Sequence, residues 1–268
     1  MLLEFEDNLP IVLVDASYYV FYRYFATMRW FVFQKQEFDT ETITENEVYI
    51  SSFVKHMESD MKKICKKWKT CIQNIVFCLD CQRCDIWRND IYNDYKGNRV
   101  QNANFNNKIF PVFIELIKNK NIKTASFDRL EADDVVYLIQ HRLKDIGSNN
   151  IIIITNDNDY LQIASDRTNI INMQFKDITL RGQKNAKADL YQKAIYGDKS
   201  DNILKIASFI TKDKALEISK LPDSDIEQWL NDNDIIEKFN LNMTLISFDN
   251  IPKDIVKSFY ETIKMKIK

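Results

Sequence analysis

The stretch Leu130–Tyr160, LEADDVVYLIQHRLKDIGSNNIIIITNDNDY, decides the fold of this 268-residue chain. Its first half has apolar residues at helical spacing until Gly147, where a helix would end. We therefore predict a helix over Leu130–Asp145 with acidic residues in its first turn. The run Ile151–Ile154 is apolar without alternation, which is typical of a strand buried on both faces of a parallel sheet.

Acidic residues follow every strand of this kind. The runs and the acids after them are Pro10–Val14 with Asp15, Ile75–Leu79 with Asp80, and Ile151–Ile154 with Asp157 and Asp159. In open α/β sheets, ligands bind outside the carboxyl ends of the strands. These acids, and Glu131, Asp133 and Asp134 of the helix start, are therefore expected to face one crevice. Helix capping alone explains a single acidic turn equally well, but it does not explain the repetition.

A further acidic pair, Asp198 and Asp201 in GDKSDN, is spaced to share one face of a helical turn. Clustered carboxylates repel one another unless a cation neutralises them, and such hard oxygen ligands suit Mg²⁺ or Mn²⁺. So many carboxylates leave room for two ions roughly 3.5–4 Å apart. Two ions so placed stabilise the attacking and leaving oxygens in phosphodiester cleavage.

Composition sets the class of protein. Hydrophobic residues make up 45% and charged residues 28%, as in globular proteins, and the length suits an α/β domain with an appended helical part. The net charge of −2 lacks the overall basic signature of many nucleic-acid-binding proteins. An odd number of cysteines, 5, without a signal peptide predicts a reducing, intracellular location. No apolar run approaches the roughly 20 residues that span a bilayer, so we expect a soluble protein without a membrane partner.

A long polar stretch, residues 81–108, leaves the crevice directly after Asp80 and interleaves basic and aromatic residues. Cations meet phosphates and rings meet bases, so this stretch is a candidate nucleic-acid guide, with a solvated surface loop as the alternative. Phe21 and Tyr22 lie near enough to Asp15 to stack on a base, although burial in the core is the simpler interpretation. The lysines of the amphipathic helix at 45–67 are interpreted as a solvated face.

The motifs LVDAS, CLD, YKGNR, LEADDV, ITNDNDYLQ and GDKSDN occur in the order found in the 5′-nuclease superfamily, over residues 11–255. The chain resembles the flap endonucleases and the 5′-3′ exonuclease domains of the DNA polymerase I type. In the segments IWRNDIYNDYKGNR and LISFDNIPKDI it is most similar to the RNase H group of T-even bacteriophages, flap endonucleases that remove RNA primers.

The resemblance implies roles for individual residues. The metal ligands would be Asp15, Asp80, Glu131, Asp133, Asp157, Asp159, Asp198 and Asp201, with Asp134 in support. Lys96 and Arg99 match residues that contact the scissile phosphate and, with Asp133 and Asp157, form the expected catalytic set. Arg88 and Tyr95 stand beside them as candidate substrate contacts, together with Phe21 and Tyr22.

Two departures from the family pattern matter. Polymerase-type members have an Arg seven residues after the first Asp, where this chain has Tyr22 followed by Arg23. After GDKSDN the family has a Gly-rich helix-two-turn-helix that holds duplex DNA and a potassium ion, but Ile203–Ile218 contains no Gly. A degenerate helix-two-turn-helix without a potassium requirement is therefore expected.

The implied fold is α/β, a central, mostly parallel sheet flanked by helices (PIN-like), with a helical arch. Residues 1–189 would form the catalytic domain, with the arch at about 81–108, and residues 190–268 a helical DNA-binding region. The implied function is a Mg²⁺-dependent, structure-specific 5′-nuclease, a phosphodiester hydrolase acting on branched or nicked DNA and RNA–DNA in replication or repair.

Two rival functions stay open at this stage. A PIN-type ribonuclease generally has fewer acids and lacks the GDKSDN segment. A catalytically inactive nucleic-acid-binding accessory protein would have lost ligand positions, and every acidic position here is filled. A monomer is expected, and a replication clamp or a single-strand-binding protein are candidate partners.

Overall fold

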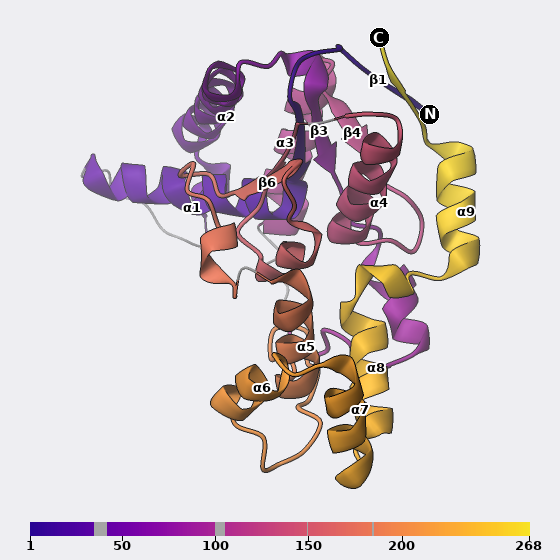
Figure 1. Ribbon diagram of the computed structural model, residues 1–268. Coiled ribbons are helices and arrows are strands. Elements are labelled where there is room, and N and C mark those ends of the chain that lie inside the picture. Colours follow the sequence, from indigo (N-terminus) through magenta and orange to yellow (C-terminus); the bar gives the residue numbers. More distant parts are fainter. Residues whose placement is uncertain (35–41, 100–104, 149, 184) are drawn as a thin grey trace.

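The computed structural model describes residues 1–34, 42–99, 105–148, 150–183 and 185–268. Its centre is a five-stranded parallel sheet in the order β4-β3-β2-β5-β6 (Figure 1). The strands are β2 (Ile11–Asp15), β3 (Ile75–Cys78), β4 (Lys123–Ala125), β5 (Ile151–Ile154) and β6 (Thr168–Ile171). Since all five run the same way, their carboxyl ends lie along one edge of the sheet, as the acidic residues predict.

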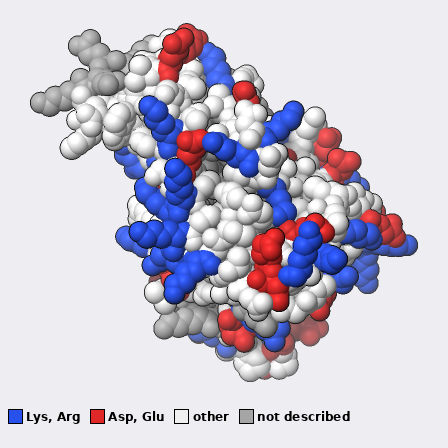
Figure 2. Space-filling view, turned by 90° about the horizontal axis from the view of Figure 1, so that it is seen from above, with Lys and Arg blue, Asp and Glu red and all other residues white. Residues whose placement is uncertain are grey.

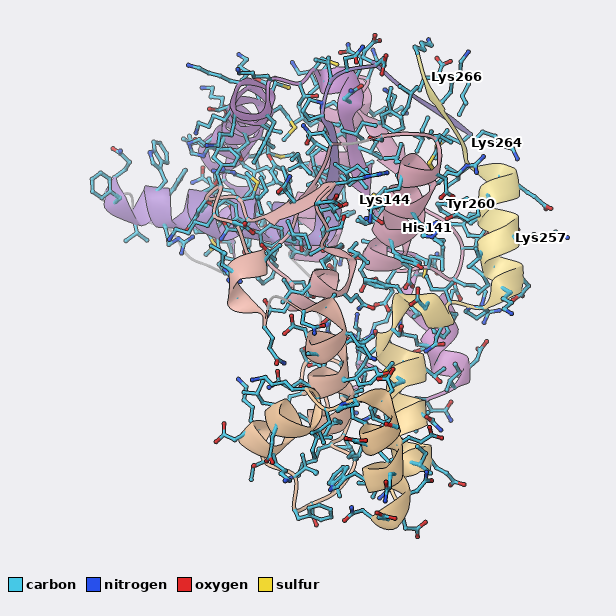
Figure 3. The ribbon with its side chains drawn as sticks, viewed as in Figure 1. His141, Lys144, Lys257, Tyr260, Lys264 and Lys266 are labelled. Carbon is cyan, nitrogen blue, oxygen red and sulfur yellow. The ribbon has the colours of Figure 1, made fainter. Side chains whose placement is uncertain are left out.

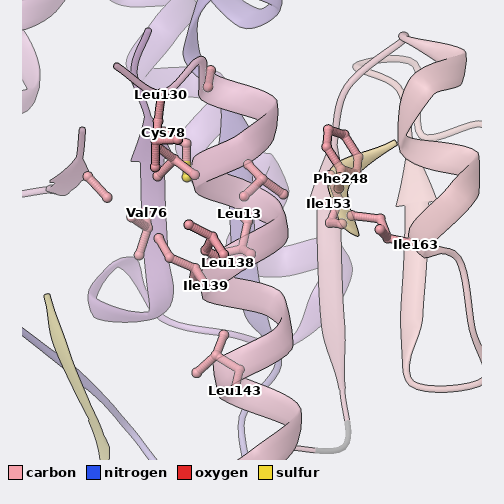
Figure 4. Close-up of a cluster of buried hydrophobic side chains, with 14 of the residues drawn as sticks. Leu13, Val76, Cys78, Leu130, Leu138, Ile139, Leu143, Ile153, Ile163 and Phe248 are labelled. Carbon is pink, nitrogen blue, oxygen red and sulfur yellow. The ribbon is translucent and has the colours of Figure 1, made fainter. Parts of the chain in front are cut away.

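Helices cover both faces of this sheet. One face packs against α1 (Ala16–Phe33), α2 (Glu47–Trp68) and α3 (Phe110–Asn119), and the other against α4 (Ala132–Asp145) and α9 (Lys253–Thr262). Alternate residues of a strand therefore enter different cores. Leu13 and Ile153 pack with Leu138 and Ile139 of α4 in one cluster (Figure 4), while Val12, Val14, Ile152 and Ile154 belong to the other. This confirms the prediction of a strand buried on both faces.

A third hydrophobic cluster lies in the group of helices α5 (Ala186–Tyr196), α6 (Lys212–Ile218), α7 (Asp223–Asp232) and α8 (Ile236–Ile246). The predicted domain boundary at residue 189 falls inside α5, so the helical group begins at Ala186. A helical region was predicted over residues 190–268, but α6 begins only at Lys212, where the Thr211 side chain caps it by accepting from the Lys214 amide at 3.1 Å. Residues 202–211 of that region therefore contain no α-helix.

The end of the chain returns to the first part of the molecule. Residues 264–267 were predicted to be helical but form a strand, β7 (Lys264–Ile267), which pairs in parallel with β1 (Leu2–Phe5). These two strands lie beside the chain termini (Figure 1). Phe259 of α9 is fully buried, with its ring centroid 5.4 Å from that of Phe127. Residues 253–268 thus belong structurally with the sheet and not with the helical group.

The predicted arch contains less helix than expected. Residues 83–85 and 87–90 form short 3₁₀ turns, Phe105–Ile109 forms a single π-helical turn, and no α-helix occurs in the described residues between β3 and α3. Residues 100–104 of the predicted arch lie outside the described residues. Within the described ranges, no helix combines the length and apolarity needed to cross a membrane.

The placement of α9 gives the first prediction. Phe259→Ala should lower the free energy of unfolding by about 3–5 kcal/mol, because it leaves a cavity between α9 and the sheet. Phe209→Ala is the matched control, since that ring is 57% exposed and its loss should cost little. Urea unfolding followed by circular dichroism measures both variants. Equal midpoints for the two would contradict the packing of α9 into the core.

Candidate metal centre

The side chain of Asp15, at the end of β2, is fixed by groups from three segments. Its Oδ1 accepts the Tyr18 amide at 3.0 Å and so caps α1, while its Oδ2 accepts the hydroxyls of Tyr160 at 3.2 Å and Thr155 at 3.4 Å. Thr155 directly follows β5 and also accepts the amide of Asp157 at 3.2 Å. The ends of neighbouring strands β2 and β5 are thereby locked together.

Asp80 ties the end of β3 to the start of α4. Its Oδ1 accepts the backbone N–H of Ala132 at 2.8 Å, and its Oδ2 accepts the Ser17 hydroxyl at 2.5 Å. A carboxylate suits the N-terminus of a helix, where amides lack partners within the helix. Capping, the alternative considered from the sequence, is therefore real at Asp15 and Asp80, and it orients both acids into the cleft.

These acids line one pocket of about 500 Å³ at the carboxyl edge of the sheet. The acids in its lining are Asp15, Asp80, Glu131, Asp133 and Asp157. We call them the first acidic cluster. All five were predicted from the sequence, and the structure brings them together. Lys96, Arg99, Phe21 and Phe105 complete the walls of this pocket with neutral polar residues.

A second acidic cluster consists of Asp159, Asp198 and Asp201, each with a carboxylate oxygen within 4.8 Å of the others. Asp198 and Asp201 do not share a helical turn as predicted, because Asp198 pairs with Ile203 in a tight antiparallel turn. Gly197 has a φ of 79°, and a Cβ there would lie 2.5 Å from the carbonyl oxygen of Ile203. The glycine is therefore required where the turn closes on itself.

Two lysines occupy the acidic clusters. The Lys193 ammonium contacts Asp159 and lies 2.6 Å from Asp198, and the Lys96 ammonium contacts Glu131 and lies 3.8 Å from Asp201. A positive charge thus stands in each cluster where the carboxylates need one. The donor set is made of hard carboxylate oxygens, so the residues present fit a divalent cation such as Mg²⁺ or Mn²⁺.

The electrostatics of the first cluster favour a cation strongly. Burial, reinforced by the nearby carboxylates of Asp80 and Asp157, raises the pKa of Asp15 to about 7. Burial and the Asp159 carboxylate raise the pKa of Asp157 to about 6, and burial with Asp134 and Glu131 raises the pKa of Asp133 well above its ordinary value. Without a cation, these acids therefore hold protons at a pH where an exposed Asp is ionised.

Arg88 and Tyr95, which were predicted as substrate contacts, are buried against the acids and do not line the pocket. Arg88 is 2% exposed, and its guanidinium donates to both oxygens of Asp134 at 2.7 and 2.8 Å and to Glu131 at 2.9 Å. Its Nε also donates to the carbonyl of Leu245 in α8 at 2.8 Å. The Tyr95 hydroxyl donates to Glu131 at 2.9 Å and lies 3.3 Å from Asp201.

Asp134 is held by other protein groups, although its carboxylate lies within 4.8 Å of those of Glu131 and Asp133. Both its oxygens are engaged by Arg88, and Oδ2 also accepts the Trp87 indole N–H at 3.1 Å. The side chain is fully buried and completes a capping box with Glu131 at the start of α4. Its role is to neutralise Arg88, which in turn holds Glu131 in position.

The remaining predicted residues differ in exposure. Arg99 donates to Asp201 at 2.6 Å, and 47% of its side chain is exposed at the pocket mouth. Phe21 is 48% exposed and lines the pocket, although core burial was the simpler expectation.

Tyr22 lies outside the pocket lining and packs near Tyr18, with ring centroids 6.2 Å apart. Arg23 pairs with the buried Asp60 and does not replace the missing family Arg.

Sequence reasoning missed Lys193 and the hydroxyls of Ser17, Thr155 and Tyr160. Lys193 lies in the last turn of α5, outside any motif, and the fold brings it to Asp159. Ser17 stands in the quoted LVDAS motif and Thr155 and Tyr160 in ITNDNDYLQ, so their proximity to acids was a usable signal.

Comparison with known proteins agrees with this geometry. A family model described as "5′-3′ exonuclease, N-terminal resolvase-like domain" matches residues 10–193. The chain is 27% identical over 217 residues to the 5′-3′ exonuclease of Buchnera aphidicola subsp. Schizaphis graminum, covering 76% of this chain and 70% of that protein. It is 25% identical over 243 residues to the ribonuclease H of Enterobacteria phage T4, covering 80% and 79%.

Solved structures show the same fold. The crystal structure of the T5 D15 protein co-crystallised with metal ions superimposes with a TM-score of 0.63, covering 94% of this chain and 97% of that one at 17% sequence identity. The predicted fold class, an α/β protein with a central parallel sheet of the PIN-like 5′-nuclease type, is confirmed.

The raised pKa of Asp15 predicts how stability depends on pH in metal-free protein. The folded state keeps a proton that the unfolded chain releases near pH 4, so this stabilisation is full below pH 4 and is lost as the pH rises through about 7. In EDTA, the melting temperature of Asp15→Asn minus that of wild type should therefore increase as the pH is raised from 4 to 8. Asp232→Asn, an exposed control in α7, should show a flat difference, and a flat difference for Asp15→Asn would refute the prediction.

The position of Lys193 gives another prediction. Lys193→Met should destabilise the metal-free protein, because Asp159 and Asp198 lose their counter-ion; the cost should be about 3 kcal/mol or less, since the three side chains keep 14–22% exposure. Mg²⁺ should then raise the melting temperature of this variant more than that of wild type, because no ammonium has to be displaced. The control is Lys187→Met, an exposed lysine of the same helix. Equal Mg²⁺-induced shifts in all three proteins would show that Lys193 does not compete with the metal.

Proposed function

Because the chain belongs to the 5′-3′ exonuclease family, we propose that it is a divalent-metal-dependent, structure-specific 5′-nuclease that acts on branched or nicked nucleic acids. The observation that carries the proposal is the meeting of carboxylates from the ends of β2, β3 and β5 with those of the turn after α5. Capping by Asp15 and Asp80 does not account for so large a set of acids, whose mutual repulsion destabilises the metal-free site.

The first acidic cluster, which does not include Asp134, would hold one Mg²⁺, and the second cluster another. Mn²⁺ has the same preference for oxygen ligands. When bound, these ions would stabilise negative charge on the phosphate and supply a water of lowered pKa. Asp157 is shared by the linings of two pockets, one lined by the first cluster and the other by Asp159 and Asp198 of the second, and so stands between the two proposed sites.

Lys96 and Arg99 are proposed to act on the scissile phosphate. Both are held at the pocket by the carboxylates of Glu131 and Asp201, which would turn to the metal ions once these are bound. The lysine and arginine are then released beside the phosphate, where fixed positive charge stabilises the charge that builds up during cleavage. The segment 95–99 is positioned for this by Arg83, which donates to the carbonyls of Lys96 and Arg99.

Phe21 is proposed to contact a base. Its exposed ring stands in the pocket wall, 5.4 Å from the Phe105 ring and 4.7 Å from the Phe25 ring, in edge-to-face arrangements. Aromatic rings at such a site stack on bases without regard to sequence, which suits an enzyme that selects its substrate by structure.

The structure bears on the rival functions. An inactive accessory protein needs no pocket of clustered acids with raised pKa values. A PIN-type ribonuclease does not require the turn that brings Asp198 and Asp201 to Asp159. The choice between DNA and RNA strands, and between flap and exonuclease cleavage, is open to direct assay. Labelled 5′-flap, nicked duplex and RNA-primed duplex, each with Mg²⁺ and with EDTA, form the test; no cleavage of any of them in Mg²⁺ would overturn the proposed function.

Removal of a proposed ligand should abolish cleavage. Asp133→Asn or Asp157→Asn should lower the rate by at least about 100-fold, because even residues behind metal ligands are worth 10–100-fold. The fold should persist, since neutralising one acid relieves repulsion in the metal-free site. Cleavage of a 5′-flap in Mg²⁺ is the readout, and Asp232→Asn is the surface control. A wild-type rate in either variant would contradict the metal assignment.

Lys205 bears on the expected absence of a potassium requirement. Two turns, at 199–202 and 208–209, connect α5 and α6, and the Lys205 ammonium donates to the carbonyls of Ser208 at 2.7 Å and Ile210 at 3.0 Å. The Lys205 ammonium thus satisfies carbonyl groups at the second turn. In addition, Ile203–Ile218 lacks the glycines that allow a backbone to come close to DNA.

Nicked-duplex affinity, measured with Ca²⁺ in place of Mg²⁺, should therefore be equal in sodium and potassium buffers. It should fall steeply with salt concentration, as contacts made by lysine side chains do. Tight binding that barely responds to salt, or a clear preference for potassium, would show that the helix-two-turn-helix works as in the family despite its sequence.

A further inference from the structure

We propose that α2 carries a second nucleic-acid contact, which binds substrate phosphates far from the acidic cleft. We call it the lysine stripe; it consists of Lys62, Lys63, Lys66, Lys67 and Lys69. The inference rests on the proposed nuclease function and adds a surface for the part of the substrate away from the cut.

The stripe is a concentration of unpaired charge in a chain whose net charge is −2. All its lysines are exposed, and none forms an ion pair with a described residue. The acids one turn earlier on α2 pair with other cations, Glu58 with Lys120 at 2.7 Å and the buried Asp60 with Arg23, and they interact with Lys62 and Lys63 without forming an ion pair. Figure 2 shows Lys and Arg side chains gathered in a column on this side of the molecule.

Helix stability does not explain the stripe. Lysines in the last turn of α2 meet the negative end of the helix dipole, which accounts for Lys66 and Lys67. Lys62 and Lys63 lie a turn earlier, and each is four residues from another lysine. Like charges at this spacing cost about 0.2–0.5 kcal/mol per pair. An arrangement with that cost is consistent with an external anion that neutralises it.

The character of the surface favours nucleic acid over a protein or a membrane. The apolar side of α2, with Phe53, Met57 and Ile64, is buried in the core. Among the described residues of α2, the large apolar side chain that is mostly exposed is Val48, at the opposite end from the stripe. Protein interfaces, by contrast, have an apolar centre, and membrane-bound helices insert an apolar face. Lysines alone suit a row of phosphates, whose contacts carry no sequence information.

The distance of the stripe from the cleft sets the length of substrate that it can reach. The start of α2 lies near the pocket, because Tyr49 packs against Tyr24, which in turn contacts the pocket residue Phe105. At 1.5 Å per residue, Lys62 and Lys69 lie about 22 and 33 Å further along the helix. A duplex rises 3.4 Å per base pair, so about 6–10 base pairs span this distance.

The test compares substrates with arms of different length. Nicked duplexes and 5′-flaps are made with each duplex arm, or the single-stranded flap, either about 5 or about 20 nucleotides long. Affinity is measured by fluorescence anisotropy in Ca²⁺ over a salt series. The variant combines Lys62→Gln, Lys66→Gln and Lys69→Gln. The matched control, with the same loss of charge, combines Lys257→Gln, Lys264→Gln and Lys266→Gln, which lie on the side of α9 and β7 (Figure 3).

The stripe variant should bind the long substrates at least about tenfold more weakly at low salt, and its salt slope should fall by about 0.9 for each phosphate that the lysines no longer neutralise. Short substrates should bind and be cleaved as by wild type. If lengthening one arm brings back the difference in affinity between the stripe variant and wild type, that arm, duplex or flap, is the part of the substrate that binds the stripe. Cleavage of short substrates by wild type tests the proposed nuclease function by itself. Failure of that function and failure of the lysine-stripe proposal can therefore be told apart.

Three outcomes would overturn the proposal. The first is an equal loss of affinity in the control variant and the stripe variant, which would indicate a general effect of charge. The second is an equal loss for short and long substrates. The third is unchanged DNA binding together with weakened binding to phosphatidylserine vesicles, which would assign the stripe to a membrane surface.

Discussion

Mutual repulsion among carboxylates is the constraint on which this structure depends. A parallel sheet sends the ends of its strands to one edge, and here those ends carry Asp15, Asp80 and Asp157. Burial makes the repulsion costly because a low dielectric strengthens it. The repulsion is reduced by protons on some acids and by the ammonium groups of Lys96 and Lys193 beside others. Each of these is a replaceable positive charge.

The basic residues beside the clusters divide into two kinds for this reason. Arg88 has a structural role. Its guanidinium forms hydrogen bonds with Asp134 and Glu131 and also donates to the carbonyl of Leu245 in α8. It joins the start of α4 to the helical group and fixes the backbone from which Glu131 projects. Lys96, Lys193 and Arg99 are partly exposed and lie at the acids themselves. In the proposed function, these three residues give way to cations and then contact a phosphate.

Local sequence predicted the sheet and the first acidic cluster well, because buried strands are continuous apolar runs and the acids directly follow them. It failed where partners are distant in the chain. Among the described strands, β1 and β7 are short and pair with each other across nearly the whole chain, so neither has a local signal. The motif around Arg88 pointed to substrate contact, yet burial against Asp134 depends on how residues 86–95 fold back over α4. The turn at 198–203 depends on a close approach at Gly197 that spacing alone does not reveal.

The central claim is that the clustered acids form a divalent-cation site whose protons and ammonium groups give way to metal. Calorimetric titration of Mn²⁺ into metal-free protein near pH 6.5, repeated in buffers of different ionisation enthalpy, tests it most directly. We predict saturable binding with net release of protons, because burial raises the pKa of Asp15 to about 7 and also raises the pKa of Asp133, so that metal binding must displace protons. Absence of saturable binding, or binding without any proton release, would contradict it.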